Sequence, residues 1–433
     1  FGISRAGAVW CPINPRNGVE ENRELLAAFD CRCLVYQQKF AALVGQIDLP
    51  IIKVCLETEL AGFIADLPGT PVQIEAVDDV AMIVGTGGTT GTPKCVMLTG
   101  HNLETMTALT LMGYPFGHRP RYLALAPLTH AAGVLCFPIL TRGGQIVIMP
   151  APDLGELLRL IPKHRVTHLF LPPTLIYMLL ADPRLAETDL SSLVCFWYGA
   201  APMSVQKLEE ALVKIGPVMA QLFGQTEAPM MITTMAPAEH FLPDGSIARA
   251  RLASCGRPSP LTTVAIMGED GALVPTAQRG EIVVKGPLVM AGYYKNPEAT
   301  RDASTFGWHH TGDIGYLDAD GYLFIVDRLK DMIISGGFNV YSSEVEQALM
   351  QHPAVQDCAV IGLPDDKWGE RVTAVVQLRG DVKAPELIAF VKARIGSVKA
   401  PKQLEIWADL PRSKVGKVLK SEIKNRLQSG GVV

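Results

Sequence analysis

Residues 86–94 read Thr-Gly-Gly-Thr-Thr-Gly-Thr-Pro-Lys. The segment follows an apolar run at 80–84 and precedes another at 95–98, so we expect two strands joined by this loop. Glycines let backbone N–H groups approach a polyphosphate, threonine hydroxyls add donors, and Lys94 adds a cation. A glycine-rich hairpin turn would explain the glycines but not the threonines and the lysine. The segment therefore predicts a phosphate-binding loop, and it differs from the Walker pattern because no Ser or Thr follows Lys94.

Outward from this loop, β-rich runs alternate with helical patterns from residue 6 to residue 222. Such alternation predicts an α/β sheet covered by helices. Around 265–285 the pattern changes to β-runs separated by Gly-rich turns, which predicts a β subdomain. We expect strands at 33–36, 51–54, 122–126, 145–149, 168–171, 193–198 and 218–222, and helices at 20–29, 102–112, 154–164, 174–180 and 205–215.

A second domain is predicted past residue 327, where the pattern restarts. A helix is expected from Ser343, with Glu346 as its capping-box partner. Strands at 359–363 and 372–378 and a helix at 385–395 follow. The fold class is therefore α/β: a large N-terminal domain over 1–327 with α/β subdomains and a β subdomain, joined through residues 328–331 to a small α+β domain over 332–433.

Composition narrows the function classes. The 433 residues carry a net charge of −4, with 48 % hydrophobic and 19 % charged residues, so no nucleic-acid partner is indicated. No uninterrupted apolar stretch reaches the length of a transmembrane segment. The nine cysteines are scattered, which favours free thiols in a reducing compartment over disulfides. A cytoplasmic enzyme is expected.

The loop at 86–94 resembles the signature loop of the adenylate-forming superfamily, which contains acyl-CoA synthetases, luciferases and peptide-synthetase adenylation domains. Gly85 and Cys95 stand where that family usually has an aromatic residue and a glycine. The resemblance extends over nearly the whole chain and begins inside the family's domain, without its usual N-terminal segment. Later motifs similar to the family's follow in order at 127–130, 199–202, 223–227, 308–313, 327–337 and 411–417.

This resemblance implies ATP and Mg²⁺ as ligands. It implies that Thr226 contacts the α-phosphate, that Glu227 holds Mg²⁺, and that Lys417 enters the active site for adenylation together with Lys94. Read from the residues alone, Thr226 also fits a helix N-cap, and Thr-Gly-Asp at 311–313 also fits a common turn. The remaining nucleotide contacts implied by resemblance are Thr86, Gly87, Gly88, Thr89, Thr90, Gly91, Gly199, Ala200, Ala201, Phe223, Gly224, Gln225, Asp313 and Arg328.

The resemblance also implies a pocket for a carboxylic acid. Its candidate residues are small or apolar, and the histidine segment has no aspartate for an α-ammonium group and no arginine for a second carboxylate. We therefore expect an apolar monocarboxylic acid, either aryl or medium-chain. The candidate pocket residues are His130, Ala132, Gly133, Trp197, Tyr198 and Met230.

For coenzyme A (CoA), the resemblance implies a site at Gly336, Gly337 and Trp368, with Val398 where the family often has an aromatic residue. Lys330 occupies the hinge position, about which the small domain would rotate between the two half-reactions. The expected activity is thus acyl-CoA synthesis through an acyl-adenylate.

Other readings stay open at this stage. A stand-alone adenylation domain that loads a carrier protein and a luciferase-like oxygenase share these motifs. A non-catalytic nucleotide-binding homologue would be expected to lose Lys417, Glu227 or Asp313, and all three are present. A homodimer and regulation by acetylation of Lys417 are further expectations.

Overall fold

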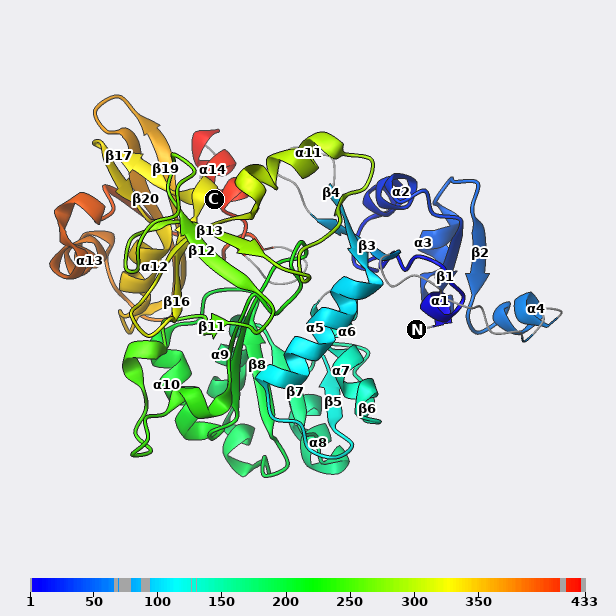
Figure 1. The fold of residues 1–433 in the computed structure, drawn as a ribbon. Coiled ribbons are helices and arrows are strands. Elements are labelled where there is room, and N and C mark those ends of the chain that lie inside the picture. The colour runs from blue at the N-terminus through cyan, green and yellow to red at the C-terminus, as the bar shows by residue number, and fades with distance from the viewer. Residues whose placement is uncertain are drawn as a thin grey trace.

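A computed structural model of the chain describes residues 2–65, 69, 79–86, 94–125, 127–129, 131–412 and 418–429. In Figure 1 the N-terminal elements, in blue, and the C-terminal strands, in yellow and orange, lie on opposite sides of the molecule. Seven predicted site residues lie outside the described residues: Gly87, Gly88, Thr89, Thr90, Gly91, His130 and Lys417.

A seven-stranded sheet forms the centre of the molecule, in the order β11-β10-β9-β8-β7-β5-β6. Five strands run parallel, and parallel neighbours require crossover connections. The parallel strands are β5 (Arg121–Ala124), β6 (Gln145–Ile148), β7 (His168–Leu171), β8 (Cys195–Gly199) and β9 (Met219–Phe223); β10 (Thr233–Met235) and β11 (Arg257–Pro258) are antiparallel.

Helices cover both faces of this sheet, as the alternating pattern predicted. One apolar core contains residues of α5 (Gly100–Gly113), α6 (Ala131–Val134) and α7 (Cys136–Thr141). The core of the other face contains residues of α8 (Leu154–His164), α9 (Pro173–Ala181) and α10 (Val205–Lys214). The strands and helices predicted for this region are confirmed to within a few residues.

The predicted β subdomain is confirmed as an antiparallel sheet in the order β12-β13-β15-β16. Its strands are β12 (Thr263–Met267), β13 (Gly280–Lys285), β15 (His309–Leu317) and β16 (Leu323–Arg328). Short 3₁₀ helices connect elements across the chain: η1 (Gln38–Phe40), η2 (Pro183–Glu187), η3 (Pro237–His240), η4 (Arg249–Arg251), η5 (Thr305–Gly307) and η6 (Leu329–Asp331).

A three-stranded sheet carries the two strands predicted around the phosphate loop. β3 (Val80–Thr86) and β4 (Lys94–Thr99) pair antiparallel, and β14 (Gly292–Tyr293) adds to the free edge of β4. α11 (Pro297–Asp302) follows β14.

The N-terminal segment packs against this hairpin. It contains a parallel pair, β1 (Cys33–Tyr36) and β2 (Ile52–Cys55), with α1 (Gly2–Arg5), α2 (Val19–Ala28), α3 (Ala41–Gly45) and α4 (Leu60–Ile64). Leu25 of α2 explains the departure at Gly85, because a Cβ at Gly85 would lie 2.5 Å from the Leu25 Cδ2 atom. Leu25 and Phe29 thus fill the space that a larger residue at 85 would need.

The C-terminal residues form a separate sheet in the order β18-β17-β20-β19, with β21 parallel to β20. Its strands are β17 (Ile333–Ser335), β18 (Phe338–Val340), β19 (Val355–Asp365), β20 (Gly369–Leu378) and β21 (Gln403–Ile406). Its helices are α12 (Ser342–Met350), α13 (Ala384–Lys399) and α14 (Lys420–Gln428).

The capping box predicted for α12 is wrong. The helix begins at Ser342, and its first-turn N–H is satisfied by the Asp327 carboxylate at the end of β16. Glu346 instead accepts a hydrogen bond from the Val360 N–H at 2.8 Å and forms an ion pair with the Lys420 Nζ at 2.7 Å. Capping is therefore supplied from a distant strand.

All nine cysteines are free, as the sequence predicted. No helix among the described residues is both long and apolar enough to cross a membrane.

Two histidines are fully buried, one within the central sheet and one in η3 beside it. His168 on β7 lies 3.1 Å from the Pro115 carbonyl through Nε2, and His240 lies 2.9 Å from the Tyr198 hydroxyl through Nε2. Burial lowers the pKa of each imidazole to about 4. Both are therefore neutral in the folded protein at pH 5, whereas in the unfolded chain their pKa is about 6.5.

We predict that this difference makes the fold acid-sensitive. Between about pH 6.5 and pH 4 the unfolded chain binds protons that the folded chain does not, so stability falls as the pH falls. Each histidine should contribute about 2 kcal/mol to the loss between pH 8 and pH 5. Thermal unfolding at the two pH values measures it: His168→Gln should shrink the pH effect, and His101→Gln, at an exposed site on α5, should not. An unchanged pH effect in His168→Gln would contradict the assignment.

Candidate active site

The pairing of β3 with β4 closes the predicted phosphate loop. Thr86 stands opposite Lys94, and the Thr86 hydroxyl donates to the Lys94 carbonyl at 3.2 Å. The two ends of the loop are therefore held side by side. The contacts predicted for Gly87 through Gly91 stay predictions.

Tyr293 contacts both Lys94 and Glu227. The Lys94 Nζ lies 5.0 Å from the centre of the Tyr293 ring, and the Tyr293 hydroxyl donates to the Glu227 Oε1 at 2.9 Å. Burial and the nearby Glu227 carboxylate raise the pKa of Tyr293 above its usual value, so its hydroxyl stays a donor. The sequence analysis did not single out this residue, which lies in the Gly-Tyr-Tyr-Lys-Asn-Pro segment at 292–297.

Three other predicted residues form one polar network. Asp313 on β15 is 3 % exposed and lies opposite Arg328 on β16, whose Nε contacts the Asp313 carboxylate at 2.7 Å. The Gln225 side-chain amide donates to the other Asp313 oxygen at 2.9 Å and to the Thr311 carbonyl at 2.6 Å. The His309 Nε2 lies 3.5 Å from Gln225 Oε1, and burial lowers the pKa of this histidine. Gln225 thus connects the segment after β9 to β15, and Asp313 in turn connects β15 to Arg328 on β16.

Residues 224–227 form a loop after β9, so the alternative of a helix capped by Thr226 is wrong. β9 ends at Phe223, and the chain turns back into β10, with the Ile232 N–H bonded to the Phe223 carbonyl at 2.8 Å. Thr226 and Glu227 are half-buried.

Close backbone contacts surround this loop. A Cβ at Gly224 would lie 2.3 Å from the Met230 nitrogen, and one at Gly199 would lie 2.4 Å from the Leu222 carbonyl. Next to these glycines, Ala200 and Met230 adopt the left-handed conformation with φ of 65° and 62°. Non-glycine residues rarely adopt it, and such strain gathers at functional sites. Ala201, the other predicted small residue here, follows Ala200 directly.

The structure separates the predicted acid-pocket residues. Trp197 and Met230 pack in one apolar core. Tyr198, the next residue along β8, points to the opposite face of the sheet, where it bonds His240. The placement of Tyr198 beside Trp197 in one pocket is therefore wrong.

The two small residues of the predicted pocket are tightly packed. Ala132 is fully buried, and a Cβ at Gly133 would lie 1.9 Å from the Leu128 carbonyl oxygen. Gly133 is therefore required by backbone packing, and a larger residue there would displace the backbone before it changed a pocket.

Trp197 lies at the centre of an aromatic cluster formed with Tyr114, Phe116, Tyr122 and His168. The four ring centres lie 5.8, 6.0, 6.2 and 5.1 Å from that of Trp197. Two buried polar atoms in this cluster, Tyr122 Oη and Trp197 Nε1, have no hydrogen-bond partner among the described residues.

The residues predicted to bind CoA lie together in the C-terminal sheet. Gly336 and Gly337 form the turn between β17 and β18 with φ of 60° and 78°, and the Gly336 N–H donates to the Trp368 carbonyl at 2.7 Å. A cavity of about 360 Å³ adjoins Gly336 and Trp368. Lys392, Lys402 and Val398 also line it, as does Ser335, whose buried hydroxyl has no hydrogen-bond partner among the described residues.

Lysines surround the Trp368 ring. The Nζ atoms of Lys367 and Lys402 lie 5.0 and 5.4 Å from the ring centre. Burial, with a contribution from Lys392, lowers the pKa of Lys402. The arrangement offers an aromatic face beside positive charge, which suits a nucleotide phosphate ester.

The predicted hinge residue Lys330 is exposed in η6, between β16 and β17. Across it, the Ser342 hydroxyl donates to Asp327 at 3.0 Å and accepts from the Lys420 Nζ at 2.6 Å. Lys417 lies outside the described residues. Arg412 and Val418, the described residues on either side of 413–417, form an antiparallel bridge.

The surroundings of Glu227 are compatible with its predicted role as a magnesium ligand. No group of three or more His, Cys, Asp or Glu side chains suited to a metal occurs among the described residues. Mg²⁺ needs no such group, because it keeps waters and binds through one or two carboxylates and substrate phosphates. Among the described residues, the Glu227 side chain accepts a hydrogen bond from the neutral Tyr293 hydroxyl, which leaves the carboxylate able to bind a cation.

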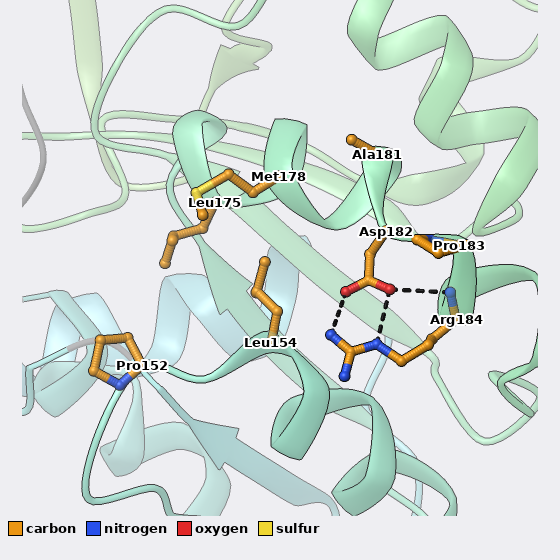
Figure 2. A pocket seen from close by; sticks show the side chains of 8 residues that line it. All are labelled: Pro152, Leu154, Leu175, Met178, Ala181, Asp182, Pro183 and Arg184. Atoms are coloured by element: carbon orange, nitrogen blue, oxygen red, sulfur yellow. Dashed lines mark hydrogen bonds and ion pairs between the residues drawn. The ribbon is translucent and has the colours of Figure 1, made fainter. Parts of the chain in front are cut away.

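An apolar cavity of about 660 Å³ lies elsewhere, on the α8 and α9 side of the sheet. Figure 2 shows Leu154, Leu175 and Met178 along it and the Asp182–Arg184 ion pair at one end. None of its lining residues is a predicted site residue.

Comparison with known proteins agrees with the family resemblance of these motifs. The family model of the AMP-binding enzymes matches residues 1–294, and that of the AMP-binding enzyme C-terminal domain matches residues 344–417. The chain is 38 % identical to a feruloyl-CoA synthase of Amycolatopsis sp., covering 98 % of this chain and 85 % of that protein. It is 41 % identical over 362 residues to the medium/long-chain-fatty-acid–CoA ligase FadD8 of Mycobacterium tuberculosis, covering 82 % of this chain and 62 % of that protein.

Solved structures agree. The o-succinylbenzoate CoA synthetase of Bacillus subtilis, in complex with its acyl-adenylate intermediate, matches with a TM-score of 0.85 and 29 % identity over 98 % of this chain and 84 % of that one. The amide bond synthetase McbA of Marinactinospora thermotolerans matches with a TM-score of 0.88 and 31 % identity over 98 % of this chain and 85 % of that one. The chain therefore belongs to the AMP-binding, adenylate-forming enzyme family that its motifs resemble.

Proposed function

We propose that this protein is an acyl-CoA synthetase that joins a carboxylic acid to CoA through an acyl-adenylate made from ATP. The observation that carries the proposal is the convergence of separate segments on residues 223–227. Tyr293 contacts both Lys94 and Glu227, and Asp313, which is paired with Arg328, accepts a hydrogen bond from Gln225. Relatives named as CoA ligases support the same activity.

In the first half-reaction, a carboxylate oxygen attacks the α-phosphorus of ATP, and the bond to the β-phosphate oxygen breaks. Pyrophosphate leaves with that electron pair. Lys94, the phosphate loop and Lys417 would balance the phosphate charge, which otherwise repels the incoming carboxylate. Thr226 would contact the α-phosphate, and Asp313 with Arg328 would hold the ribose. Mg²⁺ held by Glu227 would further neutralise the phosphate oxygens.

In the second half-reaction, the CoA sulfur attacks the acyl carbon and AMP leaves. We propose that the thiol arm of CoA runs past Gly336 and Gly337. The nucleotide end of CoA would bind against Trp368, Lys392 and Lys402. The cavity beside Trp368 supports this assignment through its aromatic face and two lysines. The Ser335 hydroxyl would gain a partner there.

The two half-reactions need different groups near one adenylate, which favours a division into domains at 1–327 and 332–433 with the hinge at 328–331. The separate sheets and cores on either side of the hinge support this division. Rotation about Lys330 would have to exchange the hydrogen bonds between Asp327 and Ser342.

The acid is proposed to be an aryl monocarboxylic acid. The cluster around Trp197 is aromatic, and its buried Tyr122 Oη and Trp197 Nε1 atoms, which have no partner among the described residues, would each gain one from a polar ring substituent. Leaving such buried atoms unpaired costs about 1–3 kcal/mol each, so a ligand that pairs them is favoured.

A cytoplasmic location remains part of the proposal, and the nine free thiols support a reducing compartment. A homodimer and regulation by acetylation of Lys417 also remain proposals. Acetylation would remove the charge that Lys417 supplies for adenylation.

We predict acid-dependent pyrophosphate release. With ATP and Mg²⁺, a panel pairing aryl acids, with and without a ring hydroxyl, against straight-chain acids of similar length should show fastest release with hydroxylated aryl acids. Mass spectrometry should detect the matching acyl-CoA when CoA is added. ATP hydrolysis at one rate with every acid and with none would contradict the synthetase assignment, and a preference for straight chains would overturn the aryl choice.

We predict that Lys417 acts in the first half-reaction alone. Lys417→Ala should slow acyl-adenylate formation by about 10²–10³, because its charge is used mainly in the transition state. The same variant should still convert supplied acyl-adenylate and CoA to product. Single-turnover assays of each half-reaction measure this.

Two variants provide the controls. Trp368→Ala should do the reverse, sparing pyrophosphate release and raising KM for CoA by about tenfold, as expected from loss of base stacking. Lys330→Pro, which stiffens the hinge, should also spare adenylation and slow thioester formation. Equal losses in both half-reactions for Lys417→Ala would mean that the active site does not rearrange.

A further inference from the structure

Tyr293 lies between two groups that the proposed reaction uses, yet no motif assignment gives it a role. We propose that Tyr293 is a positioning residue that fixes the Glu227 carboxylate for magnesium-bound ATP and holds Lys94 at the mouth of the phosphate loop. The inference rests on the proposed function and adds one residue to it.

The first support is the hydrogen bond from the Tyr293 hydroxyl to the Glu227 Oε1 at 2.9 Å. Its acceptor is an ionisable carboxylate, and hydrogen bonds to charged groups are about twice as strong as neutral ones. The donor is neutral, so it can fix the orientation of the carboxylate without cancelling its charge. A lysine or arginine at this place would compete with a cation for that charge.

The second support is the face of the same ring. The Lys94 Nζ lies 5.0 Å from the ring centre, within the range of a cation–π contact. Such a contact restricts where the ammonium group can be while using none of its N–H donors. Those donors stay available for phosphate oxygens.

The third support is the backbone on either side of Tyr293, which is bonded to both functional segments. Tyr293 on β14 pairs with Val96 on β4. The Tyr294 N–H donates to the carbonyl of Cys95, the residue that follows Lys94, at 2.7 Å. On the other side, the Met290 N–H donates to the Glu227 carbonyl at 2.7 Å. A segment of a few residues therefore sets the separation of Lys94 and Glu227, and Tyr293 is the side chain that spans it.

The neighbouring Tyr294 makes a matched control. Its hydroxyl also donates to a carboxylate, that of Asp30 at 2.6 Å, and this contact is exposed. Asp30 is not a candidate site residue. Tyr294→Phe thus removes the same chemical group one residue away without touching Glu227.

The test measures metal binding directly. Mn²⁺, which electron paramagnetic resonance detects, is titrated into the protein saturated with ATP, and ATP binding is measured separately in EDTA. Tyr293→Phe should weaken Mn²⁺ binding about tenfold, because the carboxylate is no longer held, and leave ATP binding in EDTA within twofold of the native value. Tyr294→Phe should change neither.

Adenylation provides the matching kinetic readout. Tyr293→Phe should need a higher Mg²⁺ concentration for half-maximal pyrophosphate release and recover most of its rate at high Mg²⁺. Conversion of supplied acyl-adenylate and CoA should be unchanged. In a Glu227→Gln background the Tyr293→Phe change should have little further effect on Mn²⁺ binding, since the two residues act as a pair.

Unchanged Mn²⁺ affinity in a folded Tyr293→Phe protein would overturn the proposal and leave Tyr293 as a packing residue. Full, independent losses in the double variant would overturn it too, and this comparison holds even if each variant is less stable than the native protein. Failure of the native protein to bind Mn²⁺ with ATP at all would instead contradict the proposed function.

Discussion

The pairing of β14 with β4 is the contact on which the candidate active site depends. β4 begins at Lys94, where the phosphate loop ends, and β14 contains the tyrosine that reaches Glu227. The two strands are far apart in the sequence, and their register of Tyr293 opposite Val96 and Gly292 opposite Met97 sets where the two functional segments meet. Without this pairing, nothing described here would fix the position of Lys94, at the start of β4, relative to Glu227, after β9.

Electrostatics explain why the site needs this rigidity. An activation reaction between a carboxylate and a polyphosphate brings like charges together, so cations and N–H donors must be fixed in advance. The protein also buries a carboxylate of its own at Asp313, which is stable there because Arg328 and Gln225 satisfy it. The strand β16, which pairs with the strand of Asp313, runs directly into the proposed hinge, so the site is connected to the C-terminal sheet through one strand.

Much of this arrangement could be predicted from the sequence, because alternating β and helical patterns and the order of the motifs are local signals. The phosphate-loop strands, the central sheet and the β subdomain follow from them. The face of a buried strand does not: every residue of β8 is buried, so no polar alternation distinguishes Trp197 from Tyr198. Glu346 looked like a local cap, but its partners Val360 and Lys420 come from distant segments. The roles of Gly133 and Tyr293 also depend on tertiary contacts, with Leu128 and with Glu227, that no local pattern contains.

The central claim is that a carboxylate oxygen of the acid attacks the α-phosphorus of ATP. Labelling both oxygens of the carboxylate with ¹⁸O tests it most directly, because the bond formed in that step places one labelled oxygen on the adenylate. After transfer to CoA, mass spectrometry of the nucleotide product should find AMP carrying one ¹⁸O, with the pyrophosphate unlabelled. Label in the released phosphate or pyrophosphate, or unlabelled AMP formed together with acyl-CoA, would contradict the account.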